Sequence, residues 1–205
     1  DRIASPLARA LEARGYTALT EVQEAVLNQA SDQADLLVSA QTGSGKTVAF
    51  GLAIAPEILG ETEQLGFAAE PLALIIAPTR ELALQVQREL AWLYDEARGR
   101  IASCVGGMDP RAERRALERG CHIVVGTPGR LRDHIERRAL DMSNIRAIVL
   151  DEADEMLDFG FKEDLEFILS KAPAERRTLM FSATVPPAIA ALASEFQKDA
   201  HRIST

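Results

Sequence analysis

The stretch that most constrains the fold of this chain is residues 38–47, VSAQTGSGKT. An apolar run at residues 36–38 leads into it, and an apolar-periodic segment at residues 48–58 follows it. A strand, a glycine-bearing loop and a helix in this order can turn backbone N–H groups and a helix N-terminus onto an anion. The pattern predicts a phosphate-binding loop in which Lys46 reaches the β- and γ-phosphates and the Thr47 hydroxyl ligates Mg²⁺.

One position departs from the usual form of such a loop, which begins with glycine six residues before the lysine. Ala40 occupies that position here. Gly43 and Gly45 still allow the backbone angles that other residues resist. The structural alternative is a turn followed by a chance Lys-Thr pair, so the rest of the sequence has to decide.

The composition limits the class of protein. A chain of 205 residues is long enough for one domain with a full-sized core, and no apolar run reaches the ~20 residues that span a bilayer. It begins Asp1-Arg2, with no starting methionine and no secretory segment, so we expect a fragment, and one without a membrane partner. Cys104 and Cys121 lack metal-ligand spacing and lie in or beside apolar runs, which favours buried free thiols over a disulfide and fits a reducing cytoplasm. The net charge of −8 argues against a large basic surface, although backbone amides and a few arginines can still hold nucleic-acid phosphates.

Short apolar runs alternate with amphipathic segments along the chain. The apolar runs predict strands at residues 35–40, 72–77, 101–105, 122–125, 145–150 and 178–181. Helical spacing and helix-start residues predict helices at residues 5–14, from residue 20 onward, and at residues 48–59, 80–97, 110–119, 128–136, 162–169 and 187–196. Near-continuous apolar strands are buried on both faces, so we expect an α/β fold with a mostly parallel central sheet flanked by helices on both faces. Because no linker or repeat interrupts it, residues 1–205 are expected to form a single domain.

An acidic cluster, Asp151-Glu152-Ala153-Asp154, follows the apolar run at residues 147–150. In such sheets ligands bind at the carboxyl ends of the strands. Asp151 is therefore placed to hold Mg²⁺ through water, and Glu152 to orient or deprotonate an attacking water. The structural alternative is that these carboxylates only cap the next helix, and Lys46 and Thr47 upstream favour the nucleotide site.

The chain resembles the first RecA-like ATPase domain of the bacterial-type DEAD-box RNA helicases. Residues 151–154 spell the family's name, and residues 40–47 match its phosphate loop, including alanine at the first position. Four further family motifs follow the family's order: PTRELA at 78–83, GG at 106–107, TPGR at 127–130 and SAT at 182–184. The resemblance covers nearly the whole chain and implies a RecA-like P-loop NTPase that uses ATP and Mg²⁺. It places catalysis and metal binding on Lys46, Thr47, Asp151 and Glu152, and nucleotide binding on Tyr16, Gln23, Gln41, Thr42, Gly43, Ser44, Gly45, Lys46 and Thr47.

Residues 15–16 and 20–23 resemble the family's adenine-recognition motif. The amide of Gln23 can pair with the N6 and N7 edge of adenine, and Tyr16 could stack on the base or pack beside it. Thr20 and Gln23 also form a capping box, which explains both residues without a ligand. The family usually has Pro-Thr-Pro where this chain has Leu-Thr-Glu at 19–21, so we expect an altered pocket wall.

The resemblance also implies a groove for the sugar-phosphate backbone of RNA, formed by Pro78, Thr79, Arg80, Gly106, Gly107, Thr127, Pro128, Gly129 and Arg130. Arginine forks suit phosphates, glycines allow close backbone approach, and such contacts carry little sequence preference. Ordinary turn and cap chemistry after strands is the structural alternative. By resemblance, Ser182 and Thr184 couple the nucleotide state to closure on RNA through hydrogen bonds to the segment that contains Asp154.

Other polar groups receive ordinary structural interpretations. The four arginines and two glutamates of residues 111–119 are expected to form a solvated helix face: Arg111, Glu113, Arg114, Arg115, Glu118 and Arg119. The three histidines, His122, His134 and His201, show no ligand spacing.

The sequence therefore predicts the ATP-binding domain of an RNA helicase that locally unwinds or remodels RNA. The family's second RecA-like domain, which supplies an arginine finger, is absent from this chain, and residues 198–205 are expected to begin the linker to it. Without that finger we expect adenine-nucleotide binding, weak RNA binding, poor hydrolysis and no unwinding. Another P-loop enzyme, such as a DNA helicase or a small-molecule kinase, and a non-catalytic RNA-binding module remain the alternatives.

Overall fold

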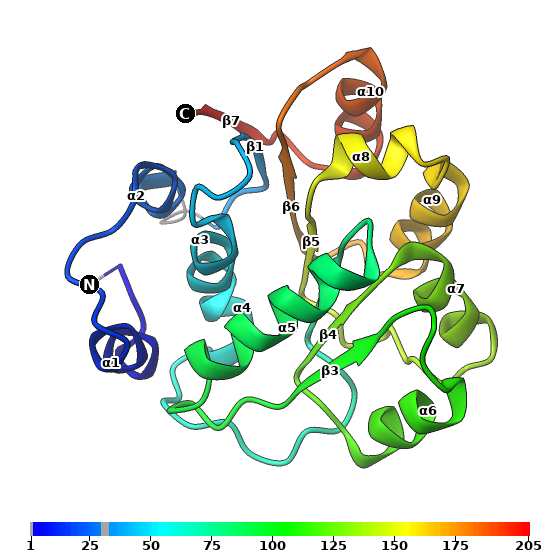
Figure 1. Ribbon diagram of the computed structural model, residues 1–205, viewed down its shortest axis with the longest axis horizontal. Helices are drawn as coiled ribbons and strands as arrows, with labels where there is room; N and C mark the ends of the chain where they lie inside the picture. The colour runs from blue at the N-terminus through cyan, green and yellow to red at the C-terminus, as the bar shows by residue number, and fades with distance from the viewer. Residues whose placement is uncertain (1, 30–32) are drawn as a thin grey trace.

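A seven-stranded sheet lies at the centre of the computed structural model, which describes residues 2–29 and 33–205 (Figure 1). Its strands run in the order β3-β4-β2-β5-β6-β1-β7, and every neighbouring pair is parallel. The strands are β1 (Leu36–Ser39), β2 (Ala73–Ile76), β3 (Ile101–Cys104), β4 (Ile123–Gly126), β5 (Ala147–Leu150), β6 (Arg177–Ser182) and β7 (His201–Ser204). The predicted α/β fold is confirmed.

Two helical layers cover the two faces of this sheet (Figure 1). One layer consists of α1 (Ser5–Ala13), α2 (Glu21–Gln29), α3 (Lys46–Ala53), α4 (Ala55–Leu59) and α5 (Arg80–Leu93). The other consists of α6 (Pro110–Arg119), α7 (Pro128–Glu136), α8 (Ala153–Asp158), α9 (Lys162–Lys171) and α10 (Pro187–Phe196).

Successive residues of a strand point to opposite faces, so the strands β1 to β6 contribute to both cores. On β2, for example, Ala73 and Ile75 belong to the core under α1–α5, whereas Leu74 and Ile76 belong to the core under α6–α10. All four side chains are fully buried. Burial on both faces is the reason why these strands are apolar without alternation.

Two predicted helices differ from the sequence expectation by more than two residues. The helix expected at residues 48–59 is two helices, because Pro56 has no N–H with which to continue the α3 ladder and instead opens α4. Helix α5 ends at Leu93, four residues before the predicted end.

The C-terminal segment is a strand rather than the start of a linker, so that prediction was wrong for residues 201–204. Strand β7 pairs with β1 at the sheet edge. Asp35 holds the incoming chain, because one carboxylate oxygen accepts the Lys198 N–H at 2.7 Å and the other accepts the Thr178 N–H at 2.8 Å. Only Ile203 is buried in this strand, so its sequence carries little apolar signal.

Both cysteines are free and buried, as predicted. Burial raises the pKa of the Cys121 thiol to about 11. Within residues 2–29 and 33–205, no helix is both long enough and apolar enough to cross a bilayer.

Candidate active site and nucleic-acid edge

The predicted phosphate loop joins β1 to α3 at the carboxyl end of the sheet. Its first residue is tied to the neighbouring strand, since the Ala40 N–H donates to the Ser182 carbonyl at 3.1 Å. Gly43 and Gly45 have φ angles of +82° and +83°, which L side chains rarely adopt. Ser44 Oγ is buried and has no hydrogen-bond partner in the described part of the chain. The loop therefore has the geometry of a phosphate cradle, with an unsatisfied hydroxyl inside it.

Gln23 supports this loop from α2. Its Nε2 donates to the Gly45 carbonyl at 3.0 Å, and its Oε1 accepts the Thr20 N–H at 3.0 Å. The Gln23 N–H in turn donates to Thr20 Oγ1 at 3.3 Å, which completes the predicted capping box. A carboxamide has two N–H donors and two lone pairs, so one of each remains for an adenine edge. The cap and base recognition are therefore compatible.

Tyr16 lies against α5. Its ring lies 5.7 Å from the ring of Trp92, at the end of α5, and is 39% exposed. Arg14 lies over the same indole, 4.6 Å from the ring centroid. Of the two residues assigned to adenine, the structure therefore brings Gln23 to the phosphate loop and packs Tyr16 on α5.

Lys46 points from the first turn of α3 to the end of β5. Its Nζ contacts Asp151 Oδ1 and lies 3.0 Å from Glu152 Oε2. Burial lowers the pKa of Lys46, but the charges and hydrogen bonds of Asp151 and Glu152 outweigh this effect and raise the pKa overall. Burial raises the pKa of Asp151, which is fully buried, against the opposing effect of Lys46. The structure thus brings together the three residues predicted to be catalytic.

These residues also fit a hard divalent cation. Asp151 Oδ2 is buried and has no hydrogen-bond partner among the described residues. Thr47, the other predicted ligand, is buried in the first turn of α3. Carboxylate and hydroxyl oxygens are the ligands that Mg²⁺ prefers.

Glu152 has a strained backbone, with φ at +52° in the left-handed region. This conformation is costly for a non-glycine residue and persists only where the surrounding structure enforces it. Here Glu152 is the N-cap of α8, immediately after the buried strand β5. The strain therefore falls on the residue that the sequence assigns to the attacking water.

Asp154 connects this site to the loop after β6. Its Oδ2 accepts the Thr184 N–H at 3.1 Å and the Thr184 hydroxyl at 3.0 Å. The Ser182 hydroxyl donates to the Thr184 carbonyl at 2.6 Å and so shapes the same turn. The predicted hydrogen bonds between the two motifs are present for Thr184, whereas Ser182 acts within its own loop.

The three motifs assigned to RNA follow three adjacent strands, β2, β3 and β4, at their carboxyl ends. Thr79 caps α5 by accepting the Leu82 N–H at 3.1 Å, and its hydroxyl proton remains for another acceptor. Thr127, by contrast, is the N-cap of α7 without a side-chain cap bond. Arg80 lies beside Gly107, since a Cβ added at Gly107 would lie 3.4 Å from Arg80 Nη1.

The side chain of Arg130 is fixed by hydrogen bonds within this chain. Its Nη1 donates to Glu113 Oε1 at 2.7 Å and to the Met108 carbonyl at 3.1 Å. Arg80 Nη2 also lies 3.4 Å from the Met108 sulfur. The loop after β3 is therefore in contact with the arginines of both flanking motifs.

The expected solvated face of α6 is confirmed for its four arginines and for Glu118, but it was wrong for Glu113. Glu113 is only 6% exposed, and His134 lies beside it with Nε2 at 2.9 Å from Oε1. One sequence signal could have shown this burial, because Glu113 lies one helical turn before the buried Leu117 on the same face of α6.

The fold and this site define a P-loop nucleotide-binding domain of the RecA-like class. The DEAD/DEAH box helicase family profile matches residues 20–192. The chain therefore belongs to the DEAD/DEAH box helicase family.

Curated relatives agree with this assignment. The chain is 42% identical over 202 residues to the DEAD-box ATP-dependent RNA helicase CshA of Bacillus licheniformis, covering 98% of this chain and 40% of the relative. It is 45% identical over 190 residues to DEAD-box ATP-dependent RNA helicase 53 of Oryza sativa, covering 92% of this chain and 31% of the relative. The chain thus spans well under half the length of these relatives.

Solved structures show the same fold. A DEAD box protein from the hyperthermophile Methanococcus jannaschii superposes with a TM-score of 0.88 at 35% identity, over 98% of this chain and 54% of that one. The yeast DEAD-box splicing factor Prp28 gives a TM-score of 0.92 at 32% identity, over all of this chain and 50% of that one.

Proposed function

We propose that this chain is the ATP-binding domain of a cytoplasmic ATP-dependent RNA helicase, which locally unwinds or remodels RNA. The observation that carries the proposal is the meeting of Lys46, from the phosphate loop, with Asp151 and Glu152 at the end of β5. A cap or a chance Lys-Thr pair does not require this buried convergence. The relatives named as ATP-dependent RNA helicases support the same activity for the longer protein.

Each residue of the site has a distinct task. Residues 41–47 hold the phosphates, mainly through backbone N–H groups and the α3 N-terminus. Lys46 exchanges its carboxylate partners for phosphate oxygens when nucleotide binds. Thr47 and Asp151 would hold Mg²⁺, which would neutralise charge on the phosphates. Glu152 orients the attacking water and accepts its proton.

Adenine selection is assigned to Gln23. The N–H and the lone pair left over from its loop and cap bonds match the donor and acceptor on the adenine edge. Guanine presents an acceptor where adenine presents its amino donor, so the same amide meets it less well. Gln23 therefore connects base identity directly to the position of Gly45 in the phosphate loop.

RNA is assigned to the edge formed by the ends of β2, β3 and β4. The proposed contacts are those predicted from the motifs: Pro78, Thr79, Arg80, Gly106, Gly107, Thr127, Pro128, Gly129 and Arg130. Backbone N–H groups, hydroxyls and guanidinium groups bind sugar and phosphate, so we expect little sequence preference. Contacts with 2′-hydroxyl groups would favour RNA over DNA.

This chain by itself is expected to bind nucleotide but to hydrolyse it slowly. In phosphoryl transfer, an arginine finger contributes about 10³ to 10⁵ in rate. We assign that finger to a second RecA-like domain outside this chain. Asp154, with Thr184, is the contact through which the nucleotide site would sense closure of the two domains on RNA.

Calorimetric titration of the chain with Mg·ADP, AMP and Mg·GDP tests the nucleotide site. We expect tight binding of Mg·ADP, weaker binding of Mg·GDP, and loss of binding in Lys46→Ala. Equal affinity for ADP and GDP would reduce Gln23 to a helix cap. No binding by a folded chain would contradict the whole proposal.

The full-length protein tests the reaction. Its ATPase should be stimulated by RNA more than by DNA and abolished by Glu152→Gln. Stronger stimulation by DNA would indicate a DNA helicase. An unchanged function in Glu152→Gln would indicate a non-catalytic RNA-binding module instead.

A further inference from the structure

A single buried carboxylate joins two of the segments assigned to RNA. Glu113 projects from α6 and accepts the Val105 N–H on Oε2 at 2.7 Å. Val105 is the residue immediately before Gly106-Gly107. On Oε1, Glu113 accepts Arg130 Nη1 at 2.7 Å, and Arg130 belongs to the first turn of α7. The loop after β3 and the start of α7 are thus fixed to the same side chain.

Arg130 completes this connection from the other side. The same Nη1 that donates to Glu113 also donates to the Met108 carbonyl, at 3.1 Å. Glu113 and Arg130 are both largely buried, with side chains 6% and 14% exposed. Glu113 therefore holds the segment before the two glycines, and Arg130 holds the segment after them. This arrangement fixes the backbone that is assigned to approach the RNA.

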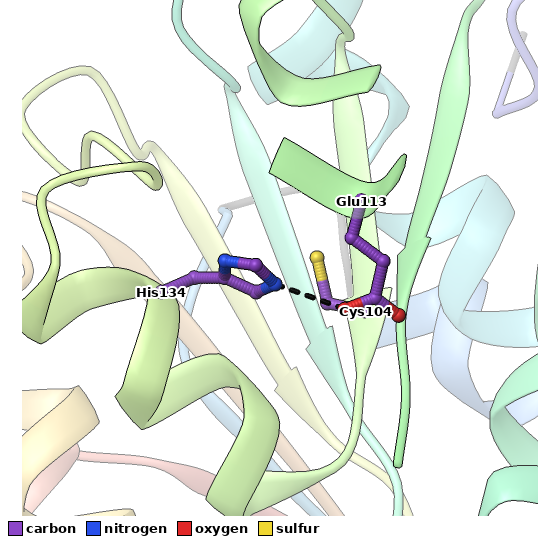
Figure 2. A group of neighbouring side chains, drawn as sticks. All are labelled: Cys104, Glu113 and His134. Atoms are coloured by element: carbon purple, nitrogen blue, oxygen red, sulfur yellow. Dashed lines mark hydrogen bonds and ion pairs between the residues drawn. The ribbon is translucent and has the colours of Figure 1, made fainter. Parts of the chain in front are cut away.

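The surroundings of Glu113 also contain the donors of a metal site. Figure 2 shows Cys104 and His134 next to it, and one ligand atom of each residue lies within 4.8 Å of the others. Burial and the charge of Glu113 raise the pKa of the Cys104 thiol, so it stays protonated. The cation that balances Glu113 is already present, because the Arg130 guanidinium contacts Oε1. The geometry therefore indicates an ion-paired brace rather than an empty metal site.

We propose that Glu113 is a positioning residue for RNA binding. Its carboxylate holds the Gly106-Gly107 loop and the Arg130 side chain in the one arrangement in which both face the RNA backbone. Glu113 itself makes no contact with RNA in this proposal. The inference rests on the proposed RNA-binding function and names a residue that the motifs do not contain.

The sign of one substitution separates this role from simple electrostatics. Glu113→Gln removes a negative charge close to the proposed phosphate path, so charge alone predicts tighter RNA binding. The positioning role predicts the opposite. A glutamine has one oxygen, so its amide NH₂ must face either the Val105 N–H or the Arg130 guanidinium, and one side loses its acceptor.

The experiment measures the affinity of the chain for a short fluorescein-labelled oligouridine by anisotropy at low salt. Glu118→Gln is the matched control, because Glu118 is exposed on the same helix and the change in charge is identical. We expect Glu113→Gln to weaken RNA binding about tenfold, as loss of a buried charged hydrogen bond implies. Glu118→Gln should bind at least as tightly as the wild type.

Mg·ADP affinity is the control for folding, because a general folding defect would lower the affinity for ADP as well as for RNA. It should be the same in Glu113→Gln and in the wild type, because Glu113 is joined to the RNA edge and not to the phosphate loop. The positioning role would be overturned if Glu113→Gln bound RNA as tightly as the wild type. It would also be overturned if this variant lost ADP affinity and RNA affinity in parallel. If the wild-type chain binds ADP but no RNA, the proposed function is what fails.

A second variant carries the test if Glu113→Gln does not fold. Glu113→Asp keeps the negative charge but shortens the side chain by one methylene group, so the carboxylate cannot reach both the Val105 N–H and Arg130. We expect a similar loss of RNA affinity with unchanged Mg·ADP affinity. Full RNA affinity in this variant would show that the brace is not needed.

Discussion

The phosphate loop offers a sharp test, because its two glycines have the same backbone conformation but different surroundings. Gly43 and Gly45 have φ angles of +82° and +83°. An alanine Cβ at Gly43 would meet nothing within 4 Å, whereas one at Gly45 would lie 2.7 Å from Gln23 Nε2 and 3.2 Å from Thr20 Oγ1. Comparing Gly45→Ala with Gly43→Ala therefore separates these side-chain contacts, of which the one with Gln23 is the shortest, from backbone strain.

The expected magnitudes follow from these geometries. A left-handed conformation costs an L residue about 1–2 kcal/mol, and both variants have this cost. In Gly45→Ala the Gln23 amide must also move, which breaks its bonds to the Gly45 carbonyl and the Thr20 N–H. Two such bonds are worth about 1–3 kcal/mol together. We expect losses in the free energy of unfolding of about 1–2 kcal/mol for Gly43→Ala and about 2–5 kcal/mol for Gly45→Ala.

Urea unfolding followed by circular dichroism measures both values. The double variant Gln23→Ala/Gly45→Ala completes a cycle, in which the cost of Gly45→Ala should shrink because the clashing amide is gone. Equal stability of the two single variants would refute the reasoning, as would an unchanged cost of Gly45→Ala in the Gln23→Ala background. Either result would mean that Gln23 does not support the loop.

Three further predictions concern other parts of the molecule. Asp35→Asn should lower the free energy of unfolding by about 1–3 kcal/mol, because the asparagine NH₂ would face the backbone N–H of either Thr178 or Lys198. Amide hydrogen exchange should become faster first in β7. Faster exchange spread evenly over the sheet would contradict this. Thr184→Val removes the hydroxyl bond to Asp154 but keeps the backbone one, so Mg·ADP binding by calorimetry should be unchanged while RNA-stimulated ATP hydrolysis by the full-length protein falls. Mg·ADP affinity should decline on acidification at a higher pH than an ordinary aspartate would give, because burial raises the pKa of Asp151 and the protonated acid cannot hold Mg²⁺. Calorimetry between pH 5 and pH 7.5 checks this, with Asp151→Asn as the control that should lose the pH dependence.

Much of the fold was predictable because strands that are buried on both faces of a parallel sheet need apolar residues at nearly every position, which is a local sequence pattern. The strands under two helical layers are continuous apolar runs, and six of the seven were recognised from them. The seventh, β7, lies at the sheet edge with only Ile203 buried, so its pairing with β1 depends on contacts that no local pattern contains. Helix α8 was missed for a related reason, since six residues are too few to show a period.

The sequence by itself also determined which residues to expect in the nucleotide site. Lys46, Thr47, Asp151 and Glu152 were predicted from residue type, spacing and position after apolar runs, and the structure brings Lys46, Asp151 and Glu152 together. Only the tertiary structure decided how the remaining polar groups are used. It directed Gln23 to both a cap and the phosphate loop, and it packed Tyr16 on Trp92. It also buried Glu113 between two RNA-assigned segments, because the partners of a polar side chain come from elements that are distant in sequence.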